Sequence, residues 1–367
     1  MRVVILIIFL LSPNLVAQQV NVRAEINPQY DALFTRTSGW SGGDGAFSVA
    51  LSSDLTLWLY SDSWIGKVRK NRHVDARMIN NAVGIQSGKD PTTATTEFFW
   101  GPKKNGKPTA LFIPDDGKGK FWIFDAALTK KGLYLFLQRT EEMADGGFRH
   151  SGTSLGFVSN PLDRPSTWRV TQTKVPFGHF SVKGDTLFGS AVLLDKGFVY
   201  VYGTSEDVEN GWHTKHMIVT RIPENDIAEF SKWRFYTKSE WRPDYSTASR
   251  IADNVANEYS VSYQAALGRY VMVYTEGGLS KNIMLRTAPT PIGEWSSPQV
   301  IYKCPEMDWD KRIFCYAAKA HPSLSEKPDE LIVTYVANST DFFHQASEAR
   351  IYRPRFIKLK FEKGPHP

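Results

Sequence analysis

The sequence predicts an all-β protein and, within that class, a five-bladed β-propeller with four-stranded antiparallel blades. The 367-residue chain contains 27 Gly and 20 Pro, and 13% of its residues are aromatic, which is typical of short strands joined by many turns. A hairpin pattern of two apolar runs around a turn also occurs five times, starting near residues 45, 121, 188, 258 and 316.

Segments between the hairpins supply the remaining strands. Three of them combine a strand, a turn that contains Pro and a Trp, at residues 161–170, 216–237 and 283–302. Each repeated unit is therefore about four strands long, and five such units around a centre form a propeller. The best helical pattern, at residues 223–230, is only about two turns long.

The two ends of the chain are expected to close the ring. Residues 20–26 and 356–361 both alternate apolar and polar side chains. Either end can therefore give a strand to the other's sheet and remove an exposed edge. Because no linker or low-complexity segment interrupts the pattern, we assign residues 19–367 to one domain.

Residues 1–18 have the layout of a secretory signal peptide. Arg2 precedes the apolar run 3–11, and a Ser-Pro-Asn break follows it. That run is too short to span a bilayer, and no other stretch is long and apolar enough. We therefore expect cleavage near residues 17–19, export to the periplasm or the cell exterior, and no membrane span.

The charge pattern argues against nucleic acid as a partner. The chain has 44 Lys and Arg against 38 Asp and Glu, a net charge of +6. These charges are interspersed, apart from short runs such as residues 67–72, whereas a nucleic-acid footprint needs a clustered basic face. We interpret the runs as solvated loops.

The two cysteines, Cys304 and Cys315, predict a local disulfide if the chain is exported. The alternative is a pair of buried thiols without a bond between them. The sequence also lacks a Gly-x-Ser-x-Gly elbow, a phosphate-binding Gly-rich loop and a His-Glu-x-x-His motif. We expect no metal and no cofactor.

Two acids flank the first hairpin. Asp44 stands just before its first apolar run and Asp62 just after its second. The start of one antiparallel strand lies beside the end of its partner, so the two carboxylates should meet at one end of the sheet. A carboxylate pair can divide the acid and base work of glycosidic bond cleavage, and nearby rings suit sugars: Trp40, Trp58 and Trp64.

Local turn chemistry is the alternative explanation for both acids. Asp44 lies between two glycines, a common turn sequence. Asp62 lies between two serines and could bond to nearby backbone N–H groups instead.

Hairpin alignment brings further candidates to the same mouth. Glu258 and Glu276 flank the fourth hairpin as Asp44 and Asp62 flank the first, and Trp122 and residues 316–319 fall at equivalent ends. His321 lies on an inner strand of the fifth hairpin. It could line the channel, bind substrate or hold an ion, or it could be a hydrogen-bonded structural histidine.

Residues 43–49 and 57–66 resemble the start of a secreted bacterial propeller family typified by endo-D-arabinanases. Residues 78–86, which include Asn81, resemble its Asn-centred strand, and residues 97–101 resemble its aromatic segment. The resemblance implies a five-bladed propeller that hydrolyses α-D-arabinofuranosyl linkages. The family's paired catalytic aspartates match Asp44 and Asp62.

The sequence therefore predicts a secreted, monomeric, endo-acting glycoside hydrolase for D-arabinan, with Asp44 as base and Asp62 as acid. Five residues are predicted to contact the polysaccharide or oligosaccharide substrate: Trp40, Trp64, Asn81, Glu258 and His321. The alternatives are a glycan-binding propeller without activity and a lyase or glycosidase for another sugar.

Overall fold

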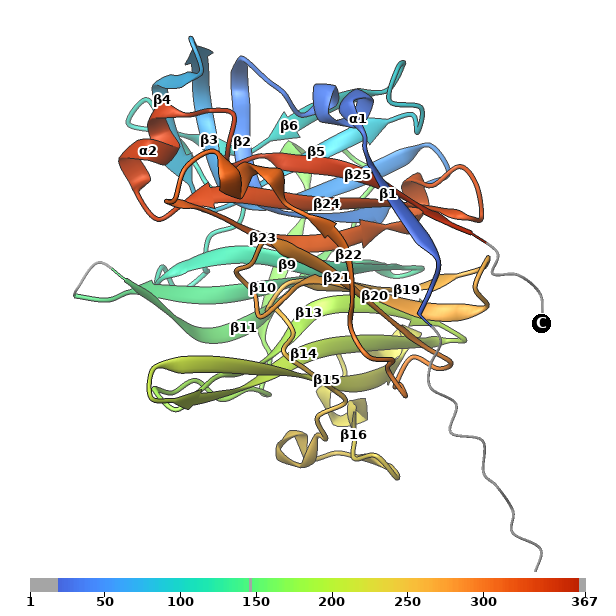
Figure 1. Cartoon of the computed structure of the whole chain (residues 1–367). Coiled ribbons are helices and arrows are strands. Elements are labelled where there is room, and N and C mark those ends of the chain that lie inside the picture. Colours follow the sequence, from blue (N-terminus) through green and yellow to red (C-terminus); the bar gives the residue numbers. More distant parts are fainter. Residues whose placement is uncertain (1–18, 145–146, 363–367) are drawn as a thin grey trace, which may run out of the picture.

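A computed structural model describes residues 19–144 and 147–362 (Figure 1). Five antiparallel sheets form the blades of a β-propeller, as predicted. The predicted signal peptide, residues 1–18, lies outside the described residues. None of the helices described in the structure is long and apolar enough to cross a membrane.

In each blade the chain runs from the innermost strand outward. In blade 5 the outermost strand, β1, comes instead from the N-terminal part of the chain. Blade 1 contains β2 (Ser38–Ala50), β3 (Leu55–Arg69), β5 (Ala82–Ser87) and β6 (Thr95–Phe99), with β4 (Arg72–Ile79) pairing β3. Blade 2 contains β9 (Lys120–Thr129), β10 (Gly132–Glu142), β11 (Phe148–Val158) and β12 (Val170–Lys174). Blade 3 contains β13 (Thr186–Asp195), β14 (Phe198–Glu209), β15 (Trp212–Pro223), β16 (Arg234–Tyr236) and β17 (Trp241–Arg242), with β18 (Ala252–Asp253) pairing β15. Blade 4 contains β19 (Tyr259–Gln264), β20 (Arg269–Thr275), β21 (Asn282–Ala288) and β22 (Gln299–Lys303). Blade 5 contains β23 (Ile313–His321), β24 (Glu330–Ser339), β25 (Pro354–Phe361) and β1 (Val22–Ile26).

The remaining elements are short. They are the hairpin of β7 (Gly101–Lys104) and β8 (Lys107–Thr109), the helices α1 (Pro28–Leu33) and α2 (Phe342–Ser347), and the 3₁₀ helices Pro165–Thr167, Glu224–Asp226, Phe230–Lys232, Tyr245–Thr247, Pro305–Asp308 and Pro322–Leu324. The helical pattern predicted at 223–230 was wrong in type, because only 3₁₀ turns form there.

The inner strands form a ring in which β2 contacts both β9 and β23. Blade 1 therefore lies between blades 2 and 5. The ring closes as predicted, because β1 pairs with β25 from Val22 opposite Phe361 to Ile26 opposite Ile357. This pairing covers the outer edge of β25.

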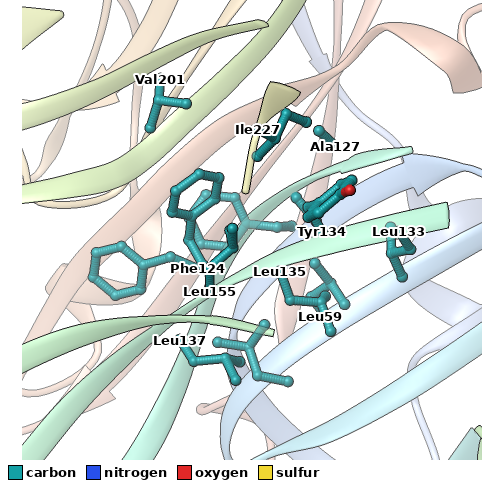
Figure 2. Packing of buried hydrophobic residues seen from close by; sticks show 14 of the residues in the cluster. Leu59, Phe124, Ala127, Leu133, Tyr134, Leu135, Leu137, Leu155, Val201 and Ile227 are labelled. Carbon is teal, nitrogen blue, oxygen red and sulfur yellow. The ribbon is translucent and has the colours of Figure 1, made fainter. Parts of the chain in front are cut away.

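The largest apolar cluster joins blades 1, 2 and 3 (Figure 2). Leu59 of β3, Leu135 of β10 and Val201 of β14 belong to it and are fully buried. The middle parts of these strands are apolar and buried at successive positions, so both faces of each sheet pack inside the protein. Burial of such a side chain contributes about 1.5–3 kcal/mol.

Strands β2 and β3 run further than the predicted segments 46–51 and 55–60. They have 13 and 15 residues, so Asp44 and Asp62 lie within strands and not at their ends. The ladder between them shifts register between Trp40 and Gly42 and again on both sides of Gly45. Such bulges re-aim side chains without ending a strand.

The predicted disulfide is present. Cys304 and Cys315 are bonded, with their Cα atoms 6.6 Å apart and a sequence separation of 11. Both residues are fully buried in the cluster between blades 4 and 5.

Replacing both cysteines with Ala should lower the free energy of unfolding by about 2–3 kcal/mol, because the unfolded chain regains the freedom of a short loop. Urea unfolding of the oxidised protein and of the double variant measures this difference. Wild type treated with a reductant should approach the double variant. An unchanged midpoint would show that the bond does not constrain the unfolded chain.

Candidate active site

A backbone bulge brings Asp44 and Asp62 together. Gly43 pairs with Ser63 and Gly45 pairs with Tyr60, so Asp44 lies opposite the two residues that this register skips, Ser61 and Asp62. Gly45 and Ala46 have φ of 82° and 53°, left-handed values that concentrate at functional sites. The acids are therefore neighbours, as predicted, but at mid-strand.

The carboxyl group of Asp44 receives hydroxyl donors. The Tyr316 hydroxyl donates to Asp44 Oδ2 at 2.6 Å, and the buried Tyr352 hydroxyl is near enough to lower the pKa of this carboxyl. Oδ1 is buried and has no hydrogen-bond partner among the described residues. Burial, followed by the charges of Asp62 and Glu258, raises the pKa of Asp44 well above its ordinary value, and the two hydroxyls oppose the shift.

The carboxylate of Asp62 receives N–H donors instead. Asn80 Nδ2 and Trp122 Nε1 each donate to Asp62 Oδ1 at 3.1 Å. Burial raises the pKa of Asp62, whereas Asn80, the charge of Lys120 and Trp122 lower it. These two donors can only donate, so they favour the ionised carboxylate.

Blade 2 adds an aromatic wall beside Asp62. The half-buried Trp122 meets Phe148 edge-on, with ring centroids 4.4 Å apart and an interplanar angle of 77°. His150 also packs edge-on against Trp122, at 5.9 Å. Burial lowers the pKa of His150 to about 4, so this ring is neutral at physiological pH.

Lys319 and Glu258 complete the surroundings of Asp44. The Lys319 ammonium lies 3.4 Å from Glu258 Oε1 and donates to the Ala317 carbonyl at 2.8 Å and to the Gly45 carbonyl. It also lies 4.2 Å from the centre of the Phe47 ring. Burial lowers the pKa of Lys319, while Glu258, Asp44 and Asp125 raise it.

An axial cavity of about 350 Å³ lies beyond Lys319, lined by all five inner strands. Its walls come from the later parts of these strands, so it lies toward the other end of the propeller, and neither Asp44 nor Asp62 lines it. Asp125, which does, accepts bonds from the Ala126 and Val192 amides at 2.8 and 2.7 Å. Burial raises the pKa of Asp125 to about 7, although these hydrogen bonds and the charge of Lys319 lower it.

The three predicted tryptophan platforms are buried, which is a correction to the sequence analysis. Trp40 is 1% exposed and stacks on Phe98 at 4.3 Å. Trp58 is fully buried, and its indole N–H donates to Gln86. Trp64 is 5% exposed and donates to Gln345. None presents a free face to a sugar, because each packs between blades or beneath α2.

His321 and Asn81 also occupy structural positions. His321 is fully buried, with Nδ1 2.7 Å from Ser48 Oγ and Nε2 2.8 Å from Thr334 Oγ1. Burial, then the charge of Lys319, holds its pKa well below the usual value. Asn81, also fully buried, bonds to the Phe112 amide and carbonyl and to the Phe121 carbonyl. Both side chains are fully engaged, so neither is placed to bind substrate.

Sequence reasoning missed Asn80 and Tyr352. Asn80 and Asn81 are adjacent in the connection between β4 and β5, where no strand alternation indicates which of the two faces Asp62. Tyr352 lies in the connection between α2 and β25, where no local motif marks it. Glu276, the other weak candidate, bonds to Asn282 and Ser280 nearby.

Among the described residues, one group of three candidate metal ligands lies close together: Cys304, Glu306 and Cys315. Both cysteines are disulfide-bonded, so their thiolates are not available to an ion.

Comparison with known proteins finds a family match over most of the chain. Residues 27–361 match a family model described as "Domain of unknown function (DUF5005)". No curated protein matches the chain. None of the matches tests the resemblance to endo-D-arabinanases.

Solved structures share the fold at low identity. A Bacteroides ovatus protein, assigned only provisionally as a hydrolase, has a TM-score of 0.74 and 19% identity over 95% of this chain and 92% of its own. Zg3597, a family 117 glycoside hydrolase of Zobellia galactanivorans, has a TM-score of 0.50 and 11% identity over 92% and 90%. A thermostable family-43 glycoside hydrolase has a TM-score of 0.47 and 15% identity over 90% and 97%. At these identities the likeness of the first two structures establishes the fold alone.

Replacement of Asn80 or Asn81 with Ala should distinguish a residue that binds Asp62 from a residue that stabilises the fold. Asn81→Ala leaves buried backbone groups unpaired and should cost about 2–4 kcal/mol of unfolding free energy, because each such group costs about 1–3 kcal/mol. Asn80→Ala should change stability by less than about 1 kcal/mol, while it weakens any function of Asp62. Urea unfolding of the two variants measures the difference. Equal destabilisation would contradict the assignment.

Proposed function

We propose that this chain, which belongs to the family described as DUF5005, is a glycoside hydrolase that uses Asp44 and Asp62 as its carboxylate pair. The observation that carries the proposal is the pair itself: two half-buried acids side by side with chemically different partners. Glycosidic hydrolysis needs one carboxyl group protonated and the other ionised. Different surroundings are how a protein separates two such acids.

The contacts favour Asp44 as the acid, the reverse of the assignment made from the sequence. Hydroxyl groups can donate or accept, so Tyr316 and Tyr352 tolerate a protonated Asp44, and its Oδ1 has no partner in the described part of the protein. The N–H donors at Asp62 require an acceptor and favour its charge. Asp44 would protonate the leaving oxygen, and Asp62 would act as base or nucleophile.

For the substrate we propose D-arabinan cut within the chain, with the protein secreted as a monomer. The sequence resemblance over residues 43–66 supports the sugar, and the layout of residues 1–18 supports export. The half-buried Trp122, joined to Asp62, supplies an aromatic surface of the kind that sugar rings contact.

A panel of polysaccharides incubated with residues 19–367 tests the proposal. Mycobacterial arabinogalactan belongs in the panel, with Asp62→Asn as the control. Oligosaccharides released from arabinan by wild type alone would support both the chemistry and the sugar. Release from another glycan would keep the chemistry and replace the sugar. Binding without products by both proteins would contradict the proposal and favour a glycan-binding propeller.

Asp44→Asn and Asp62→Asn should each fold and should lower kcat by about 10²–10⁴-fold, the usual range for a general acid or base. Initial rates on the polysaccharide that wild type hydrolyses measure this loss. The matched control is Asp116→Asn, which changes a carboxyl with a salt bridge to Arg139 outside the site. A folded Asp44→Asn variant with full activity would contradict the proposal.

Asp44→Asn should also raise Tm at neutral pH, by about 2 °C or more. A carboxyl whose pKa is higher in the folded than in the unfolded protein stabilises the folded state fully only below its unfolded pKa of about 4. That stabilisation is lost as pH rises through the folded pKa. Asn does not ionise, so the variant does not lose stability in this way. Melting curves at pH 7.5 and near pH 4 measure the effect, which should shrink at the lower pH. A constant difference would exclude the titration of Asp44 as its cause.

The pH profile should distinguish the two acids. Tyr316→Phe removes a hydroxyl that lowers the pKa of Asp44, so the alkaline limb of kcat/KM should move to higher pH. Asn80→Ala removes a donor that lowers the pKa of Asp62, so the acidic limb should move to higher pH. Rates across pH 4–9 with both variants measure these shifts. If Tyr316→Phe moves the acidic limb instead, Asp44 is the base.

A further inference from the structure

Exposed apolar side chains gather at the end of the propeller that carries the acids. The connection between the second and third strands of each blade lies at this end, because the second strand runs past the level of Asp62 toward it. In blades 2 to 5, these connections or the residue that follows them carry large apolar side chains that are exposed. They are Met143 (41%), Phe148 (53%), Trp212 (79%), Leu279 (66%), Phe342 (53%) and Phe343 (82%).

The opposite end of the propeller carries fewer exposed apolar side chains. Among the described residues there, the large apolar side chains that are exposed are Leu194 and Tyr263, with Leu162 on an outer connection. Single exposed apolar residues are ordinary. A concentration of aromatic rings around one site marks a binding surface.

On blade 5, two exposed phenylalanine rings are linked to Asp44 through packed, buried side chains. Phe342 stacks on Trp64 with centroids 5.6 Å apart, and Phe343 meets Phe342 edge-on at 6.4 Å. Trp64 in turn packs with Tyr352, whose hydroxyl influences the pKa of Asp44. Asp341 caps α2 by accepting from the Phe343 amide at 2.9 Å, which stabilises the backbone that carries both rings.

On blade 2, the second aromatic surface adjoins Asp62. Trp122 donates to Asp62, and Phe148 packs against the outer side of Trp122. Blade 1, which carries both acids, lies between blades 2 and 5. The acid pair therefore has an exposed aromatic surface on each side.

We propose that Phe343 and Phe148 bind sugar units on opposite sides of the bond that is cut, so that an internal stretch of a neutral polysaccharide crosses this face. The aromatic face is electronegative and attracts the C–H groups of a sugar ring. Neither residue has a part in the chemistry, because neither contacts an acid. The inference rests on the proposed function and specifies how its substrate binds.

The test uses Phe343→Ser and Phe148→Ser, both made at exposed positions so that folding is kept. Each should lower kcat/KM on arabinogalactan about five- to tenfold, the change expected for loss of one stacking contact. The change should lie in KM, with kcat and Tm unaltered. Activity on the shortest oligosaccharide that is still cut should change less, because it does not reach the outer position.

The matched control is Tyr263→Ser, which removes an aromatic ring that is 52% exposed at the other end of the propeller. It should leave kcat/KM unchanged on both substrates. If it has the same effect as Phe343→Ser, the loss is not specific to this face and the inference is wrong.

Binding is measured separately from activity by electrophoresis through gels that contain arabinogalactan, with Asp62→Asn as the parent. Retardation that is weakened by Phe343→Ser and Phe148→Ser supports the two surfaces, even if wild type hydrolyses no glycan and the proposed function fails. Retardation that is unchanged overturns the inference, while hydrolysis by wild type would keep the proposed function. Absence of retardation in the parent also overturns it. Self-association that Phe343→Ser abolishes, without any effect on retardation, would assign the rings to a protein contact instead.

Discussion

The site depends on one buried ammonium group. Lys319 is 1% exposed, and its three donors reach Glu258 and the carbonyls of Ala317 and Gly45, so it joins blades 4, 5 and 1 at the propeller axis. A buried cation is tolerated only when its donors are satisfied. Meeting that requirement turns the Gly45 carbonyl toward the axis, and the left-handed backbone at Gly45 and Ala46 is the form that allows it. Asp44 directly precedes this turn, so the same ammonium that closes the axis also positions the acid.

The partners of the two carboxyl groups explain how neighbouring acids can differ. Burial raises the pKa of both Asp44 and Asp62, and for Asp44 the nearby charge of Asp62 adds to it. This crowding costs stability at neutral pH, a cost that is common where function requires a strained or charged site. The hydroxyls at Asp44 accept either protonation state, whereas the N–H groups at Asp62 favour only the charged one. The partners of the two carboxyl groups therefore favour the reverse of the roles that the sequence predicts for Asp44 and Asp62.

The parts of the structure that sequence could predict are those that local patterns determine. Hairpins have both strands and their turn in one segment, so all five were identified, and Asp44 met Asp62 because one hairpin holds both. Which face a residue occupies was predicted less well. Bulges in β2 and β3 shift the alternation, so Trp40, Trp58 and Trp64 could not be assigned to core or surface from spacing. Asn80 and Asn81 lie in the connection between β4 and β5, where strand alternation does not indicate which of the two faces Asp62. Tyr316 and Tyr352 reach Asp44 only because the ring closes, a contact between opposite ends of the chain that no local pattern encodes.

The closed axis also limits how a substrate can approach. Lys319 and Asp125 line the axial cavity, and the acids lie outside it on the face that carries the long strand connections. A chain threaded along the axis would have to displace a satisfied ammonium and would not pass between the acids. In the proposed arrangement a chain would cross the face that carries Asp44 and Asp62, between Phe343 on blade 5 and Phe148 on blade 2. Such binding would not require a chain end, so it would favour cleavage within a polymer.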